Sequence, residues 1–158
     1  MIEELSIKFT ITGTPQPKKT HRTRSVFSKG RAISINYAHP DNRRAERYIL
    51  SQILNELPPE PLKGPIIMNV VYYMPVLKSF PKWKKAFTEC HDLPHIVKPD
   101  TDNLNKMLGD AFTKAGVYTD DAVVYQFNAK KIYSSMPRTE VKLIKLKEIT
   151  TDDALSFP

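Results

Sequence analysis

One segment of the chain carries most of the information about its fold and chemistry: residues 98–121, which read KPDTDNLNKMLGDAFTKAGVYTDD. It contains five aspartates and three lysines, a net charge of −2, whereas the 158-residue chain carries +7. The remainder is therefore strongly basic. Aspartates held close together repel one another unless a cation neutralises them. An acidic segment in a basic chain is typical of an enzyme that holds a divalent metal ion against a phosphate backbone.

Helical periodicity predicts a helix over residues 102–115. At 100° per residue, one apolar stripe faces the core, and its members are Leu104, Leu108, Ala111, Phe112 and Ala115. The opposite face carries Asp102, Lys106 and Asp110 at steps of four. The helix therefore has one face for packing and one face of charged groups.

Two further carboxylates, Asp120 and Asp121, follow the helix and precede a predicted strand. The turn between helix and strand can bring Asp121 back towards Asp100 and Asp102. Three carboxylates of this kind suit Mg²⁺, which also binds waters and substrate phosphate oxygens. The spacing is equally consistent with a structural explanation, in which these residues only cap the helix, form a surface ion-pair ladder and make a turn.

The whole sequence predicts a small α+β fold, a mixed and largely antiparallel sheet packed with two to three helices. Strands are expected over residues 5–11, 32–35, 66–74, 123–133 and 140–149, and further helices over residues 41–57 and 79–87. We expect one domain over residues 1–149 and a short acidic tail over residues 150–158.

Local signals refine this outline. Asp41 or Asn42 is the expected cap of the first helix, and Ser79 that of the second. The last two strands are expected to pair as a hairpin. The run at 66–74 is apolar on both faces, which indicates a central strand or one covered by a partner subunit.

Composition limits the setting in which the protein works. A lone cysteine, Cys90, excludes an internal disulfide and fits a reducing cytosol. The first residues lack the features of a signal peptide, and no apolar run approaches the ~20 residues that span a bilayer. We therefore expect a cytoplasmic protein with no membrane partner.

The motif resembles the signature of the RusA family of Holliday junction resolvases. The matching elements are Asp100-x-Asp-Asn-Leu-x-Lys106, then Asp110-Ala, then Thr113-Lys-Ala-Gly116, and finally Asp120-Asp-Ala-x-Val124. Order and spacing both agree over residues 98–124, and the agreement elsewhere is weaker but consistent.

The resemblance implies a small homodimeric endonuclease of bacterial or phage origin that cuts four-way DNA junctions by paired nicks. It implies Mg²⁺ as the cofactor, with Mn²⁺ as a substitute, held by Asp100, Asp102 and Asp121. It also implies an essential lysine at Lys106, which we expect to act as a positive charge on the transition state. The motif positions whose roles stay open are Asn103, Asp110 and Asp120.

Basic residues outside the motif are candidates for DNA contact. Six lie between the first strand and the first helix: Lys18, Lys19, Arg22, Arg24, Lys29 and Arg31. Contacts from such residues to phosphates would make binding depend steeply on salt. A second cluster surrounds Trp83, which is expected to be a core anchor rather than a base-stacking group. A solvated charged loop remains the alternative for the first cluster.

Two other functions compete with junction cleavage. A Mg²⁺-dependent phosphohydrolase of small nucleotides would use a similar acidic cluster, but it would leave the basic remainder unexplained. A structure-specific DNA-binding protein with vestigial carboxylates would explain the charge. Metal-dependent nicking of a synthetic junction separates these three functions.

Overall fold

The computed structural model describes residues 3–28, 30–37 and 39–148. Its central sheet has four strands in the order β1-β6-β4-β5, with bounds β1 Glu3–Thr12, β4 Ile66–Pro75, β5 Val124–Ser134 and β6 Arg138–Leu146. β6 lies antiparallel between β1 and β4, whereas β5 lies parallel to β4 at the edge. The expected mixed, largely antiparallel sheet is confirmed.

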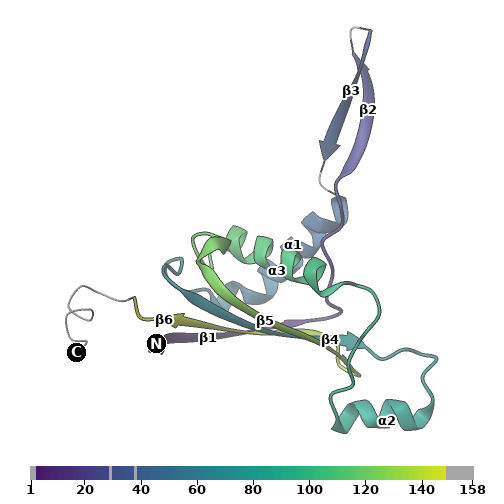
Figure 1. The fold of residues 1–158 in the computed structure, drawn as a ribbon, viewed down its shortest axis with the longest axis vertical. Coiled ribbons are helices and arrows are strands. Elements are labelled where there is room, and N and C mark those ends of the chain that lie inside the picture. Colours follow the sequence, from purple (N-terminus) through teal and green to yellow (C-terminus); the bar gives the residue numbers. More distant parts are fainter. Residues whose placement is uncertain (1–2, 29, 38, 149–158) are drawn as a thin grey trace.

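The acidic segment belongs to the connection between the two parallel strands. Parallel neighbours cannot be joined by a tight turn and need a long crossover. Here the crossover holds α2 (Lys82–Cys90), α3 (Thr101–Ala115) and a short 3-10 helix, η2 (Asp121–Val123). Figure 1 shows α3 lying over one face of the sheet, with β5 returning beneath it. The fold therefore fixes the acidic helix between two adjacent strands.

The core lies between this face of the sheet and two helices, α3 and α1 (Pro40–Ile53) (Figure 1). Every second residue of β4 is buried: Ile66, Met68, Val70, Tyr72 and Met74. α3 contributes Leu104, Met107, Leu108, Ala111 and Phe112, which confirms the predicted stripe apart from Ala115, which is only partly buried. β4 is thus a central strand, and the core accounts for the apolar residues of its buried face.

A second sheet stands away from the body of the protein. β2 (Arg22–Ser28) and β3 (Arg31–Tyr37) pair only with each other, and Figure 1 shows them as a projecting hairpin. The two strands are joined by a tight turn, in which Gly30 adopts the positive φ of 76° that such a turn favours. Phe27 lies near the tip and is 80% exposed. We name β2, β3 and their turn the hairpin arm.

Several local predictions are wrong. β5 and β6 do not form a hairpin, because β4 lies between them and β6 gains pairing partners on both edges. α1 is capped by His39 rather than Asp41 or Asn42, because Pro40 is tolerated at a first helical position. α2 is preceded by Pro81 rather than Ser79. The helix ends here follow proline positions more than side-chain caps.

Two remaining predictions concern the chain as a whole. The acidic tail over residues 150–158 lies outside the described residues. In the described part of the chain, the helices are all too short or too polar to cross a membrane.

Candidate active site

Asp100 is the residue immediately before α3. Its backbone is extended (φ −69°, ψ 141°), and its side chain makes no capping hydrogen bond to the helix. The carboxylate is exposed. The capping role that its position favours is therefore not used, and its oxygens are directed to solvent, where another ligand can reach them.

The segment that leads into Asp100 is held by Lys131 of β5. The Lys131 Nζ donates hydrogen bonds to the carbonyl oxygens of Val97 at 2.9 Å and Pro99 at 2.5 Å. The backbone N–H of His95 donates to the Lys131 carbonyl at 3.0 Å. Together with Asp100, these residues border an open hollow of about 630 Å³. Lys131 thus positions Asp100 from a neighbouring strand, and no sequence motif indicated it.

Asp102 and Lys106 form an ion pair on the exposed face of α3. The Lys106 Nζ lies 2.7 Å from Asp102 Oδ2, and the two side chains are 70% (Asp102) and 58% (Lys106) exposed. A solvent-exposed i,i+4 pair contributes only a few tenths of a kcal/mol to stability. Such a pair separates easily when a cation or a phosphate competes for either partner.

Asp110 does not continue this pair into a ladder. It forms an ion pair with Lys18, in the segment between β1 and the hairpin arm. The backbone N–H of Lys18 also donates to the Asn103 carbonyl at 2.8 Å. The Asp110 side chain and the Asn103 backbone therefore anchor the root of the hairpin arm to α3.

The two neighbouring aspartates after α3 have different environments. Asp120 accepts a hydrogen bond from the Ala122 N–H at 2.8 Å and caps η2. Asp121 is exposed at the first position of η2. Burial, with further contributions from the charges of Asp121 and Asp110, raises the pKa of Tyr118 to about 12. Asp121 therefore lies in the electrostatic reach of the Tyr118 hydroxyl.

This environment places Asp121 away from the start of α3. The Tyr118 hydroxyl donates to the Gly109 carbonyl at 3.3 Å. Gly109 lies seven residues after Asp102, which is ~10 Å along the helix axis. Within residues 3–28, 30–37 and 39–148, no three His, Cys, Asp or Glu side chains form a group that could hold a metal ion. Within one chain, Asp100 and Asp102 lie at the start of α3 with Lys106 one turn further on, whereas Asp121 follows the helix.

The donor chemistry at the start of α3 nevertheless fits a hard divalent cation. Asp100 and Asp102 supply exposed carboxylate oxygens, the ligand type that Mg²⁺ prefers, and the site is open to waters and phosphate. Mg²⁺ is commonly bound through one or two carboxylates together with substrate phosphates.

The six basic residues predicted to contact DNA lie in different structural environments. Lys18 pairs with Asp110, and Lys19 pairs with Asp41 at 2.5 Å, so both fasten the root of the hairpin arm. Arg24 and Arg31 are exposed on the hairpin arm. The side chain of Arg22 and all of Lys29 lie outside the described part of the structure.

Two features of the basic surface differ from the sequence prediction. Trp83 is 69% exposed on α2, so its expected role as a core anchor is wrong; Phe80 packs on Tyr133 instead, with ring centroids 4.9 Å apart. Arginines on α1 were not predicted as candidates at all, although the sequence Arg43-Arg-Ala-Glu-Arg47 shows them. The signal that could have identified them is their density, three arginines in five residues on the face opposite the apolar stripe.

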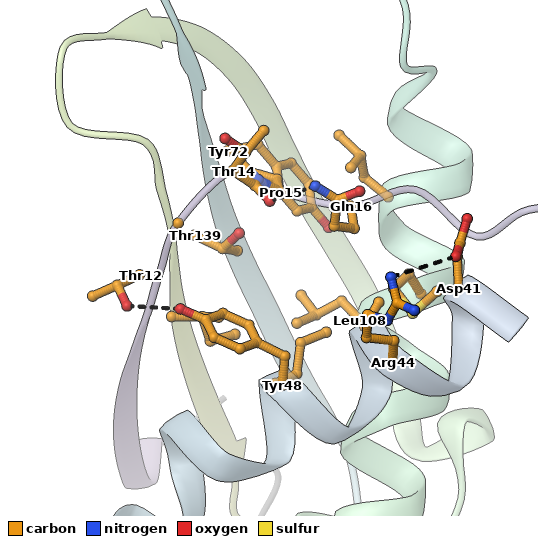
Figure 2. Close-up of a pocket in the computed structure, with 16 residues that line it drawn as sticks. Thr12, Thr14, Pro15, Gln16, Asp41, Arg44, Tyr48, Tyr72, Leu108 and Thr139 are labelled. Carbon is orange, nitrogen blue, oxygen red and sulfur yellow. Dashed lines mark hydrogen bonds and ion pairs between the residues drawn. The ribbon is translucent and has the colours of Figure 1, made fainter.

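A cavity of about 490 Å³ lies between the end of β1, α1 and α3. Figure 2 shows Tyr48, whose hydroxyl lies 3.2 Å from Thr12 Oγ1, at one side and Leu108 at its floor. α3 lines this cavity with its buried residues, so Asp102 and Lys106 face elsewhere. The lining of the cavity therefore does not include Asp100, Asp102 or Lys106.

Comparison with known proteins identifies the family to which the chain belongs. The family profile described as Endodeoxyribonuclease RusA matches residues 9–144, and the chain belongs to this family. It is therefore an endodeoxyribonuclease, a hydrolase that acts on DNA, in a family whose nucleases generally depend on a divalent metal ion.

Two relatives support the assignment. The chain is 31% identical over 140 residues to the Uncharacterized protein YqaN of Bacillus subtilis (strain 168), which covers 87% of this chain and 94% of that protein. It is 28% identical over 109 residues to the Crossover junction endodeoxyribonuclease rusA of Lactococcus phage r1t, covering 67% of this chain and 76% of the relative.

Proposed function

We propose that this protein is a Mg²⁺-dependent endonuclease that resolves four-way DNA junctions in recombination and repair by paired, symmetric nicks. The observation that carries the proposal is the group of Asp100, Asp102 and Lys106 at the exposed start of α3. A crossover junction endodeoxyribonuclease is also among its relatives.

Each residue of this group has a distinct task. Asp100 and Asp102 would hold the metal ion, which would supply an activated water and stabilise charge on the phosphate. Lys106 exchanges its ion pair with Asp102 for a contact with the scissile phosphate. There its positive charge stabilises the transition state. Lys131 keeps Asp100 in place through the Val97 and Pro99 carbonyls.

We further propose that Asp121 of a second copy completes the site. Asp102 lies in the first turn of α3 and Asp121 follows the helix, which is held in the core by Leu104, Leu108 and Phe112, so bringing the two aspartates together within one chain would disrupt this packing. A homodimer needs no such distortion. It also has the two-fold symmetry that cutting two related strands requires.

The direct test uses a labelled four-way junction, a linear duplex and nucleoside triphosphates, each with and without Mg²⁺. The expected result is Mg²⁺-dependent nicking of the junction alone, at symmetric positions. Hydrolysis of the triphosphates would instead indicate the nucleotide phosphohydrolase. Binding of the junction without cleavage would contradict the catalytic role of the carboxylates in this chain.

A further inference from the structure

α1 has a buried face and a basic face. Asn42, Ala45 and Ile53 are buried against the body of the protein. On the other side, Arg43, Arg44 and Arg47 are exposed. Steps of one and four residues place these arginines within about 100° of each other around the helix axis. Three guanidinium groups therefore leave the helix in similar directions.

Nearby carboxylates neutralise only part of this basic face. Asp41 pairs with Lys19 at 2.5 Å and, more distantly, with Arg44 at 4.0 Å. Glu46 lies between the arginines in sequence but turns to α3, where Lys114 Nζ is 2.6 Å from its carboxylate. In the described part of the chain, Arg43 and Arg47 have no ion-pair or hydrogen-bond partner. Their charge is available to an external anion.

The same arginines line a hollow at the root of the hairpin arm. Its volume is about 460 Å³, and its lining residues are Tyr37, Pro40, Arg43, Arg44 and Arg47. Tyr37 is the last residue of β3, and Pro40 is the first of α1, so the hollow lies where the hairpin arm meets the body (Figure 1). Tyr37 is 41% exposed and adds a hydroxyl donor and a ring face.

This hollow is connected to the active site by a short series of contacts. Asn42 exchanges hydrogen bonds of 2.8 Å with the backbone of Lys19. The adjacent Lys18 is bonded to Asn103 and Asp110 of α3. The start of α1 is thus held beside the half of α3 that carries Asp102 and Lys106.

We propose that Arg43, Arg44, Arg47 and Tyr37 bind the phosphodiester backbone of one duplex arm of the DNA junction. The inference rests on the proposed function for the identity of the DNA, although the anion chemistry is independent of it. A guanidinium group binds two phosphate oxygens with two parallel hydrogen bonds. This geometry makes arginine better suited to a phosphodiester backbone than lysine, whose ammonium acts as a point charge. A duplex held here would run from the hairpin arm towards the reacting carboxylates.

The test is the salt dependence of DNA binding, measured by fluorescence anisotropy in EDTA so that cleavage does not interfere. The R43Q/R47Q double variant removes the two unpaired charges without touching the buried face. If each contacts a phosphate, the slope of log affinity against log salt falls by about 1.8, and affinity at 0.15 M salt falls about 30-fold. Arg43→Lys with Arg47→Lys should keep most of the slope.

Lys8→Gln with Lys63→Gln is the matched control, because it removes the same charge from exposed positions away from α1. Its slope should stay close to that of the wild type. Circular dichroism melts identify any variant that fails to fold. If the control and R43Q/R47Q lose the same affinity and slope, the effect is one of net charge and the proposal is overturned. An unchanged slope in R43Q/R47Q would also overturn it.

Cleavage is scored separately, so the two proposals fail in different ways. If the wild-type protein binds DNA with a steep salt dependence but never cleaves a junction, the proposed function is contradicted. The proposed DNA-binding surface of Arg43, Arg44, Arg47 and Tyr37 is not. A wild-type protein that cleaves junctions while R43Q/R47Q binds normally would count against the surface alone.

Discussion

Lys106 donates a hydrogen bond of 2.7 Å to Asp102, one turn earlier on α3, and both side chains are exposed to solvent. A proposed metal ligand and a positively charged group thus share one helical face. Because the opposite face of α3 is buried, the spacing of the two groups is fixed by the core of the protein. Changes at either residue should therefore affect chemistry much more than stability.

Removing individual carboxylates should abolish cleavage while junction binding persists. Asp100→Asn, Asp102→Asn and Asp121→Asn each lose a metal ligand, but they also lessen the repulsion of DNA. Gel-shift and cleavage assays on the same samples measure both effects. Asp92→Asn is the control, an exposed aspartate paired with Lys130. Near-normal cleavage by one of the three variants would exclude that residue from the site.

Lys106→Ala should reduce single-turnover cleavage ~10²–10³-fold, the typical cost of removing a preorganised charge. Its fold and Mg²⁺ affinity should be retained, because the Lys106 side chain takes no part in the core. Lys114→Ala is a matched control on the same helix, where the lysine pairs with Glu46 instead. A rate reduction smaller than about fivefold would indicate that Lys106 forms only a surface ion pair.

The protein should be a dimer at micromolar concentration in analytical ultracentrifugation. Mixed dimers of Asp102→Asn and Asp121→Asn chains test how the site is built. If Asp121 comes from the partner, one of the two sites is intact and the mixture nicks one strand. If every site lies within one chain, both sites are damaged and the mixture is inactive. Monomer alone, with or without a junction, would contradict the dimer.

Charge reversal on the hairpin arm should weaken binding to all DNA and flatten its salt dependence. Arg22→Glu with Arg24→Glu removes positive charges that supply affinity rather than selectivity, so cleavage positions should be unchanged. The slope against log salt should fall by roughly 0.9 for each phosphate that is no longer neutralised. An unchanged slope would instead favour a DNA path along Lys82, Lys84 and Lys85 on α2.

Stability should fall below about pH 6.5, the ordinary pKa of histidine, through His95. Burial, followed by the charge of Lys131, lowers the pKa of His95 in the folded protein. The unfolded chain then binds more protons, so the contribution is complete above pH 6.5 and is lost as the pH falls through the folded pKa. Urea unfolding between pH 5 and 7 should show a shallower dependence for His95→Gln than for the wild type.

The exposed His91, which stacks on Phe87, provides the comparison for this measurement. His91→Gln should keep the wild-type dependence on pH. Identical pH profiles for His95→Gln and the wild type would assign the loss of stability to other groups.

Much of the fold was predictable because its signals are local. Alternation defines β1 and β4, and a stripe at steps of three and four defines the buried face of α3. The strand order was not predictable in the same way. Adjacent strands usually pair, so β5 and β6 were expected to form a hairpin, whereas the preference of β6 for both β1 and β4 is a property of the whole sheet.

In the candidate site, too, local features were predictable from the sequence and long-range contacts were not. The placement of Asp102 and Lys106 follows from one helix, and the sequence predicts it. Lys18 pairs with Asp110 across 92 residues of chain, and such a partner cannot be inferred from spacing. The position of Asp121 depends on how β5 returns beneath α3. Its distance from the start of α3 therefore emerged only from the structure.

The position of β6 between β1 and β4 has a consequence for synthesis of the enzyme. Ile7 pairs with Leu143, so the first strand finds its neighbour only after the residues up to β6 have left the ribosome. Pairings this distant in sequence make folding slow, because the connecting chain must be ordered first. During translation, α3 has only part of the sheet to pack against. The sheet on which α3 packs is therefore completed only once β6 has been made.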